Sequence, residues 1–178
     1  KSLLQSYYPH KNLLITDIVT NFMTAVLKSL NVTDFKELNT YSKMKIFIYL
    51  ILEQGIQDEG VERVVKSILS DRNSLDRWSQ IFDNWLKDEG VKHDLGNDRQ
   101  VQIGLNFIIT AGGSLYIKRT ELDLDADQIS DIMVKTFMST FLSIDEAKID
   151  QTIGEAKSAL QKYELATLTQ TINEMFDN

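Results

Sequence analysis

The chain lacks the residues on which much protein chemistry depends. Its 178 residues include no cysteine, two histidines and one proline. Without cysteine there is no disulfide framework, no thiolate metal site and no cysteine nucleophile. A histidine metal site or an imidazole-centred hydrolase would have to combine His10 and His93 from distant positions. We therefore expect neither a metal site of these kinds nor an enzyme that uses these residues.

Positive charge and long apolar runs are also scarce. Lys and Arg number 19 against 26 Asp and Glu, and this net charge of −7 argues against a broad nucleic-acid surface. No apolar run approaches the roughly 18 residues of a membrane span, and the first residues lack a signal-peptide pattern. A composition of 43% hydrophobic and 25% charged residues is typical of a folded globular protein. We expect a cytoplasmic protein that does not contact membranes.

Known catalytic and cofactor motifs are missing as well. The sequence contains no Walker loop, no Gly-x-Gly-x-x-Gly and no Gly-x-Ser-x-Gly. A calcium loop beginning at Asp123 would have Gln128 where glycine is required and Val134 where the bidentate glutamate belongs. We expect no cofactor and no catalytic residues.

Hydrophobic residues recur at helical spacing along nearly the whole chain. Strand-like alternation and internal repeats are absent, so we predict one all-α domain of about eight or nine helices. The segment 41–57 is apolar on nearly every side and is predicted to lie buried in the middle of the domain. The helical patterns cover residues 10–30, 41–57, 61–69, 75–86, 101–116, 129–141, 149–163 and 165–176, the last two either separate or joined.

Short polar segments predict where these helices begin and end. Ser70–Asn73 resembles a turn, and residues 91–98 form the clearest interior loop. Asp125-x-x-Gln128 and Ser143-x-x-Glu146 each fit the capping box that opens a helix.

A short motif near the start carries a family resemblance. Residues Leu4–Leu14, with the sequence LQSYYPHKNLL, resemble the segment of TetR-family transcriptional regulators that joins the DNA-recognition helix to the ligand-binding domain. The family pattern is roughly Leu-Tyr-x-x-Phe-x-x-Lys-x-x-Leu. Leu4, Lys11 and Leu14 match it, and Tyr8 replaces the Phe, whereas Gln5 replaces the Tyr that commonly contacts DNA phosphate.

The resemblance implies a division of the chain and a function. Residues 1–9 would end the recognition helix of a helix-turn-helix that mostly precedes Lys1, residues 10–142 would be the ligand-binding and dimerisation domain, and residues 143–178 a helical extension of it. The helix 10–30 would link the DNA-binding headpiece to the body. The implied protein is a homodimeric transcriptional regulator, a repressor in the usual case, that binds operator DNA through the headpiece and a small-molecule effector in the body. Phosphate contacts would remain at Tyr8, His10 and Lys11.

The resemblance also implies where dimerisation occurs, and the residue pattern suggests an effector pocket. The last two long helices of the family domain pair with their partners in a second subunit. The implied interface residues are Leu105, Ile109, Gly112, Tyr116, Ile129, Met133 and Phe137. An apolar effector pocket would be lined by Tyr41, Met44, Phe47, Trp78, Phe82, Trp85, Asn106 and Thr110.

Simpler interpretations remain open for both the pocket and the function. The aromatic residues at helical spacing also fit ordinary core packing. For the protein as a whole, the alternatives are a helical protein-interaction module and a carrier of a hydrophobic ligand, neither with a role on DNA.

Overall fold

The structure is a computed structural model, and it describes residues 35–88 and 98–162 together with residues 17, 20, 21, 23, 24, 26, 27 and 30. All secondary structure in this described part is helical, which confirms the all-α prediction. The helices are α3 (Thr40–Gln57), α4 (Glu59–Leu69), α5 (Arg72–Asp88), α6 (Asp98–Ile117), α7 (Arg119–Leu122), α8 (Ala126–Thr136), the π-helical turn η2 (Phe137–Phe141) and α9 (Glu146–Leu160).

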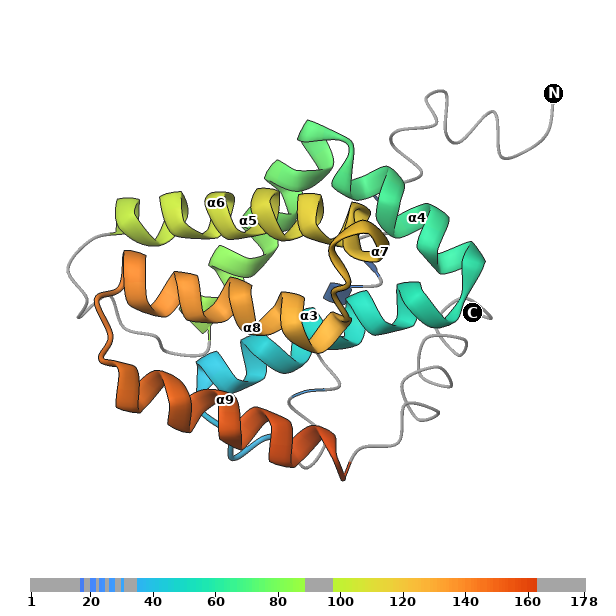
Figure 1. Ribbon diagram of the computed structural model, residues 1–178. Coiled ribbons are helices and arrows are strands. Elements are labelled where there is room, and N and C mark those ends of the chain that lie inside the picture. Colours follow the sequence, from blue (N-terminus) through green and yellow to red (C-terminus); the bar gives the residue numbers. More distant parts are fainter. Residues whose placement is uncertain are drawn as a thin grey trace, which may run out of the picture.

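Helix α3 lies in the middle of the domain, as its all-round apolar pattern predicts. It packs against α4, α8 and α9, and Figure 1 shows it behind the α8 and α9 layer. The Asn39 side chain caps its start by accepting a hydrogen bond from the Ser42 amide at 3.0 Å. The Asn39 amide also donates to Glu155 of α9 at 2.7 Å, so one residue both begins the central helix and ties it to α9.

Helices α4 and α5 form the next pair along the chain. They are joined at Ser70 and Asp71, where a turn was predicted, although α5 already begins at Arg72. The Asp71 side chain accepts a hydrogen bond from the Ser74 amide at 2.9 Å, which satisfies one of the free amides at the start of α5. Helix α5 then packs against α6.

The predicted capping box at Asp125 is confirmed. The Asp125 carboxylate accepts from the Gln128 amide at 2.7 Å, and the Gln128 side chain accepts from the Asp125 amide at 2.9 Å. The short helix α7 precedes this capping box.

The predicted capping box at Ser143 is wrong. Asp145 begins α9 instead, because its carboxylate accepts a hydrogen bond from the Lys148 amide at 3.0 Å. Ser143 adopts a left-handed backbone with φ of 52°, within the turn that reverses the chain. The helix predicted over 129–141 also changes its winding at Phe137, where η2 begins.

Helix α9 packs against α3 and η2, so residues 146–160 belong to the same core as the rest of the domain. Earlier in the chain, Met23, Val26 and Leu30 are helical and buried in this core. The expected loop at 91–97 and the segment 165–176 lie outside the described residues. No helix in the described part is both long enough and apolar enough to span a membrane.

Candidate functional site

Helices α6 and α8 run side by side in opposite directions (Figure 1). Their register is fixed by two glycines of α6. A Cβ added to Gly104 would lie 2.8 Å from Cγ of Phe141, and a Cβ added to Gly112 would collide with the side chain of Met133. These two positions therefore allow the helices to pack closely, with large side chains of α8 and η2 against the backbone of α6.

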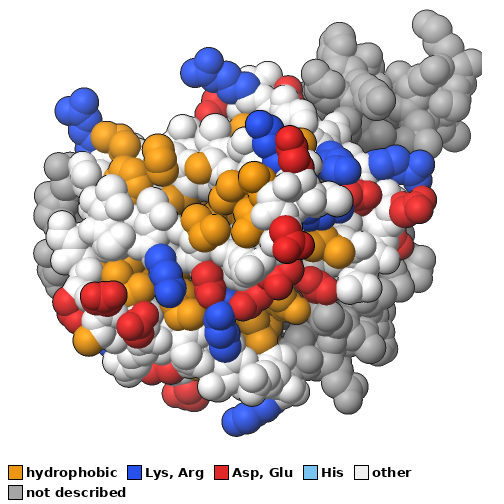
Figure 2. Space-filling view, in the orientation of Figure 1, with side chains coloured by type: hydrophobic (Ala, Val, Ile, Leu, Met, Phe, Trp, Pro, Cys, Tyr) orange, Lys and Arg blue, Asp and Glu red, His pale blue; other side chains and the backbone are white. Residues whose placement is uncertain are grey.

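The outward side of this helix pair carries exposed hydrophobic side chains. Ile103 and Phe107 of α6 are 47% and 54% exposed, and Ile132 of α8 is 42% exposed. The Phe107 ring lies 5.5 Å from that of half-buried Phe141, which continues the apolar surface across the two helices. Figure 2 shows hydrophobic side chains gathered on this side of the molecule. We call the surface formed by these four residues the α6–α8 face.

The residues implied as the dimer interface do not lie on that face. Tyr116, Ile129 and Phe137 are fully buried within one subunit, because they pack α6 and α8 against each other and against the remaining core. The same burial holds for the others: Leu105, Ile109, Gly112 and Met133. These side chains are therefore covered within a single chain, and the dimer interface stays a prediction.

Most residues of the predicted apolar effector pocket are buried, and several of their rings contact one another. Phe47 and Phe82 are buried, and their rings meet edge to face at 4.7 Å. Trp85 lies edge to face with Phe82 at 5.9 Å. Met44 and Trp78 are also buried, Tyr41 is half-buried and Thr110 is exposed. These contacts fit the core-packing interpretation of the aromatic stripe, and the effector pocket stays a prediction.

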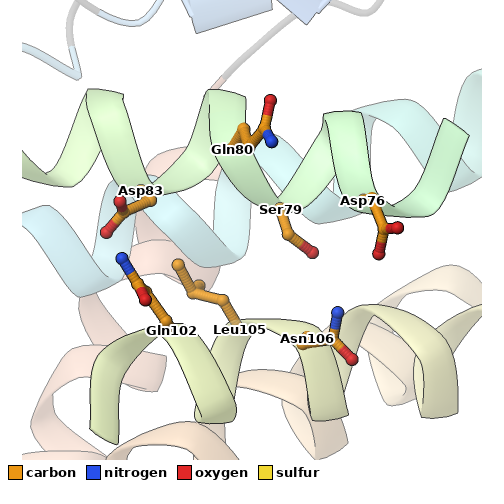
Figure 3. A pocket seen from close by; sticks show the side chains of 7 residues that line it. All are labelled: Asp76, Ser79, Gln80, Asp83, Gln102, Leu105 and Asn106. Atoms are coloured by element: carbon orange, nitrogen blue, oxygen red, sulfur yellow. The ribbon is translucent and has the colours of Figure 1, made fainter. Parts of the chain in front are cut away.

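Asn106, the remaining predicted pocket residue, lines a different hollow. This groove lies between α5 and α6 and has a volume of about 330 Å³. Figure 3 shows Asp83 opposite Gln102 and Asp76 opposite Asn106, with Ser79 and Leu105 between these two pairs. Gln80 also lines it, although its side chain points away from α6 in this view. We call this hollow the α5–α6 groove.

The groove combines negative charge with polar groups that lack protein partners. Lys87 donates to Oδ2 of Asp83 at 2.6 Å, and no hydrogen bond between α5 and α6 crosses the groove among the described residues. The Ser79 hydroxyl oxygen is shielded from solvent and has no hydrogen-bond partner there. A polar group in that position costs free energy unless a water or ligand satisfies it. The sequence pattern did not single out Asp76, Ser79 and Asp83 as site residues, although their spacing places them on one side of α5.

A second polar cluster joins α3, α8 and α9. The Lys45 side chain is 0% exposed, and its ammonium lies 2.6 Å from Oδ1 of Asp127 and 3.1 Å from Oδ1 of Asp131. Lys157 of α9 bridges the same two carboxylates from outside, at 2.9 Å and 2.7 Å. The Lys45 ammonium also lies 3.2 Å from the Ser130 hydroxyl. A charge inside the core is thus matched by two opposite charges.

The titration of this cluster follows from its geometry. Burial alone would raise the pKa of the Asp127 carboxyl, but hydrogen bonds from Lys45 and Lys157 outweigh burial and hold that pKa below its usual value. Hydrogen bonds to Asp131 and Asp127 raise the pKa of Lys157. Both groups therefore stay charged near neutral pH, as a structural cluster requires.

The remaining site predictions fall at the start of the chain. Tyr8, His10 and Lys11, the expected phosphate contacts, lie outside the described residues, as does the whole motif from Leu4 to Leu14. Among the described residues, no group of three or more His, Cys, Asp or Glu side chains could hold a metal ion. Comparison of this chain with protein-family models, with curated proteins and with solved structures gave no match.

Proposed function

We propose that this chain is the effector-binding and dimerising body of a TetR-type transcriptional regulator. The observation that carries the proposal is the α6–α8 face, an exposed apolar surface on two antiparallel helices. An exposed cluster of large hydrophobic side chains is unfavourable in water and is typical of a protein–protein contact. Two such helices from each of two subunits would form a four-helix bundle.

A second copy of the chain is the partner that fits this face. Helix α6 has 20 residues, so it offers a contact about 30 Å long. A two-fold interface places the same surface on both sides, and Phe107 and Ile103 of each subunit would then cover the corresponding residues of the other. The resemblance of Leu4–Leu14 to the family linker suggests why the chain would dimerise, because two headpieces at a fixed spacing can recognise a two-fold symmetric operator.

The proposed mechanism connects effector and DNA through the helical body. Met23, Val26 and Leu30 anchor the helix that follows the family-like motif in the core of the body. A change in packing within the body would therefore shift that helix and alter the spacing of the headpieces. The coupling free energy between two sites in allosteric proteins is typically about 1–3 kcal/mol, which is enough to change operator affinity severalfold or more.

Sedimentation velocity tests the dimer. We expect the chain to sediment as a dimer at micromolar concentration and the double variant Ile103→Ser, Phe107→Ser to sediment as a folded monomer. The matched control is Ile56→Ser, because Ile56 is an exposed hydrophobic residue on α3, 38% exposed, away from the α6–α8 face. A monomeric parent chain, or a double variant that remains dimeric, contradicts the proposed interface.

DNA binding is tested with the full gene product that contains this chain. We expect that product to enrich a two-fold symmetric duplex from a random pool. Enrichment of no sequence, with the dimer intact, would refute the regulatory role and leave a helical interaction module.

A further inference from the structure

We propose that the α5–α6 groove is an effector site and that it binds a linear polyamine cation. The regulatory part of this inference rests on the proposed function, whereas binding itself does not. The groove is a separate place from the aromatic stripe that the sequence pattern favoured, and its chemistry is polar and acidic rather than apolar.

The spacing of the two carboxylates determines the shape of the ligand. Asp76 and Asp83 are seven residues apart on α5, so they lie two helical turns apart on one side of the helix. Their positions are separated by about 10 Å along the helix axis. One compact cation cannot reach both carboxylates, but an extended chain with an ammonium group at each end can.

The sign of the ligand charge follows from the lining residues. Two carboxylates, one hydroxyl and three side-chain amides line the groove, and neither Lys nor Arg is among these residues. Lys87 occupies Oδ2 of Asp83 from the same helix, which leaves Oδ1 of that carboxylate for a ligand. An anion would be repelled by the carboxylates, of which only Asp83 is paired with Lys87, whereas an ammonium group would gain charge-assisted hydrogen bonds.

The opposite wall supplies one side-chain amide facing each carboxylate. Gln102 and Asn106 are four residues apart on α6, and each faces one of the carboxylates across the groove (Figure 3). Their amide oxygens can accept hydrogen bonds from the same two ammonium groups. Leu105 and Ser79 lie between the two pairs, where an apolar side chain beside a shielded hydroxyl suits the methylene chain of the ligand.

The groove also adjoins the proposed dimer contact. Gln102 directly precedes Ile103, and Asn106 directly precedes Phe107, so the ligand contacts and the α6–α8 face lie on adjoining sides of one helix. A ligand that draws α5 and α6 together would therefore shift α6 relative to the second subunit. Ligand binding in the groove would change the dimer contact in this way.

Titration calorimetry with the whole chain tests the inference, with spermidine as the probe and putrescine as the shorter comparison. We expect spermidine to bind saturably with one site per chain and putrescine at least tenfold more weakly, because putrescine carries one fewer positive charge and bridges the two carboxylates only at full reach, without also meeting the side-chain amides of α6. Asp76→Asn and Asp83→Asn should each weaken spermidine binding about tenfold or more, since each removes a charge-assisted hydrogen bond.

Asp88→Asn is the matched control, because it removes the same charge from an exposed position of α5 outside the groove. It should change spermidine affinity less than twofold. Absence of saturable binding at millimolar spermidine overturns the inference, as does an equal loss in all three variants, which would show general attraction to an acidic protein. A dimer without spermidine binding refutes this inference alone, and a monomer that binds spermidine refutes only the proposed function.

Discussion

The buried Lys45 gives the sharpest test of how this fold is held together. Removing both carboxylates that face it, by Asp127→Asn with Asp131→Asn, would leave an ammonium that is 0% exposed without a counter-charge. Breaking a buried ion pair in this way typically costs about 3–5 kcal/mol. The substitutions are nearly isosteric, so the expected loss reflects charge rather than a cavity.

Removing the buried ammonium instead of its carboxylates should destabilise the fold much less. In Lys45→Met the two carboxylates keep their partner Lys157, and Met fills most of the lysine volume. Because no charge is left buried without a partner, we expect a loss below about 2 kcal/mol. Adding Lys45→Met to the double Asn variant should then recover more than half of the stability that the double variant lost. This recovery is the non-additive outcome that identifies an isolated charge as the cause.

Equilibrium urea unfolding followed by circular dichroism measures these differences. Lys135→Met serves as the control, since Lys135 pairs with Asp150 on the surface at 4.0 Å and should contribute less than about 1 kcal/mol. If the double Asn variant loses less than about 1 kcal/mol, or if the triple variant is no more stable than the double variant, the assigned role of the cluster is refuted.

Two further predictions concern pH and helix packing. The folded-state pKa of Asp127 is lowered below its unfolded value of about 3.9, so the unfolded state takes up its proton first as pH falls. The stability that Asp127 contributes is therefore fully present above about pH 5 and is lost as pH falls through the folded pKa. Urea titrations at pH 7 and pH 4 measure this loss. Asp127→Asn should reduce the loss, and an unchanged loss would contradict the assignment. Gly104→Ala should lower the free energy of unfolding by about 1–3 kcal/mol, and the melting temperature with it, because its Cβ would press on the rings of Phe137 and Phe141. In Gly154→Ala the added Cβ meets nothing within 4 Å in the middle of α9, so this variant should raise the free energy of unfolding by about 0.4–1 kcal/mol. The reverse order of the two variants would refute the α6–α8 register.

Helical periodicity alone identified most of the described fold. The segments predicted at 41–57, 61–69, 75–86 and 101–116 all match helices, within a few residues at each end. The central position of α3 also followed from its sequence, because a helix that is apolar on nearly every side cannot face water. The capping box at Asp125 was recognisable because both of its hydrogen bonds are made between residues three apart.

Local sequence patterns gave a wrong prediction where two residues could each cap the same helix. Ser143 and Asp145 both precede α9 and both can cap a helix, and the choice depends on where the chain turns after η2. The chain shortly before Asp125 likewise forms the short helix α7, which no periodic pattern predicts.

The candidate sites depended on tertiary structure. In α6 the hydrophobic residues occupy more than one side, so the sequence cannot state which of them face α8 and which face solvent; the packing buries Leu105 and Ile109 and leaves Ile103 and Phe107 exposed. Only the docking of α5 on α6 brings Asp76 and Asp83 opposite the amides of α6.

The amino-acid sequence by itself determined the all-α class, the helical segments and the absence of cysteine chemistry, because periodicity and composition are properties of single segments. The tertiary structure decided the environment of Lys45, the open groove and the exposed α6–α8 face. Each of these arises between helices that are distant in the sequence, so its charge balance and exposure exist only once the helices have packed together.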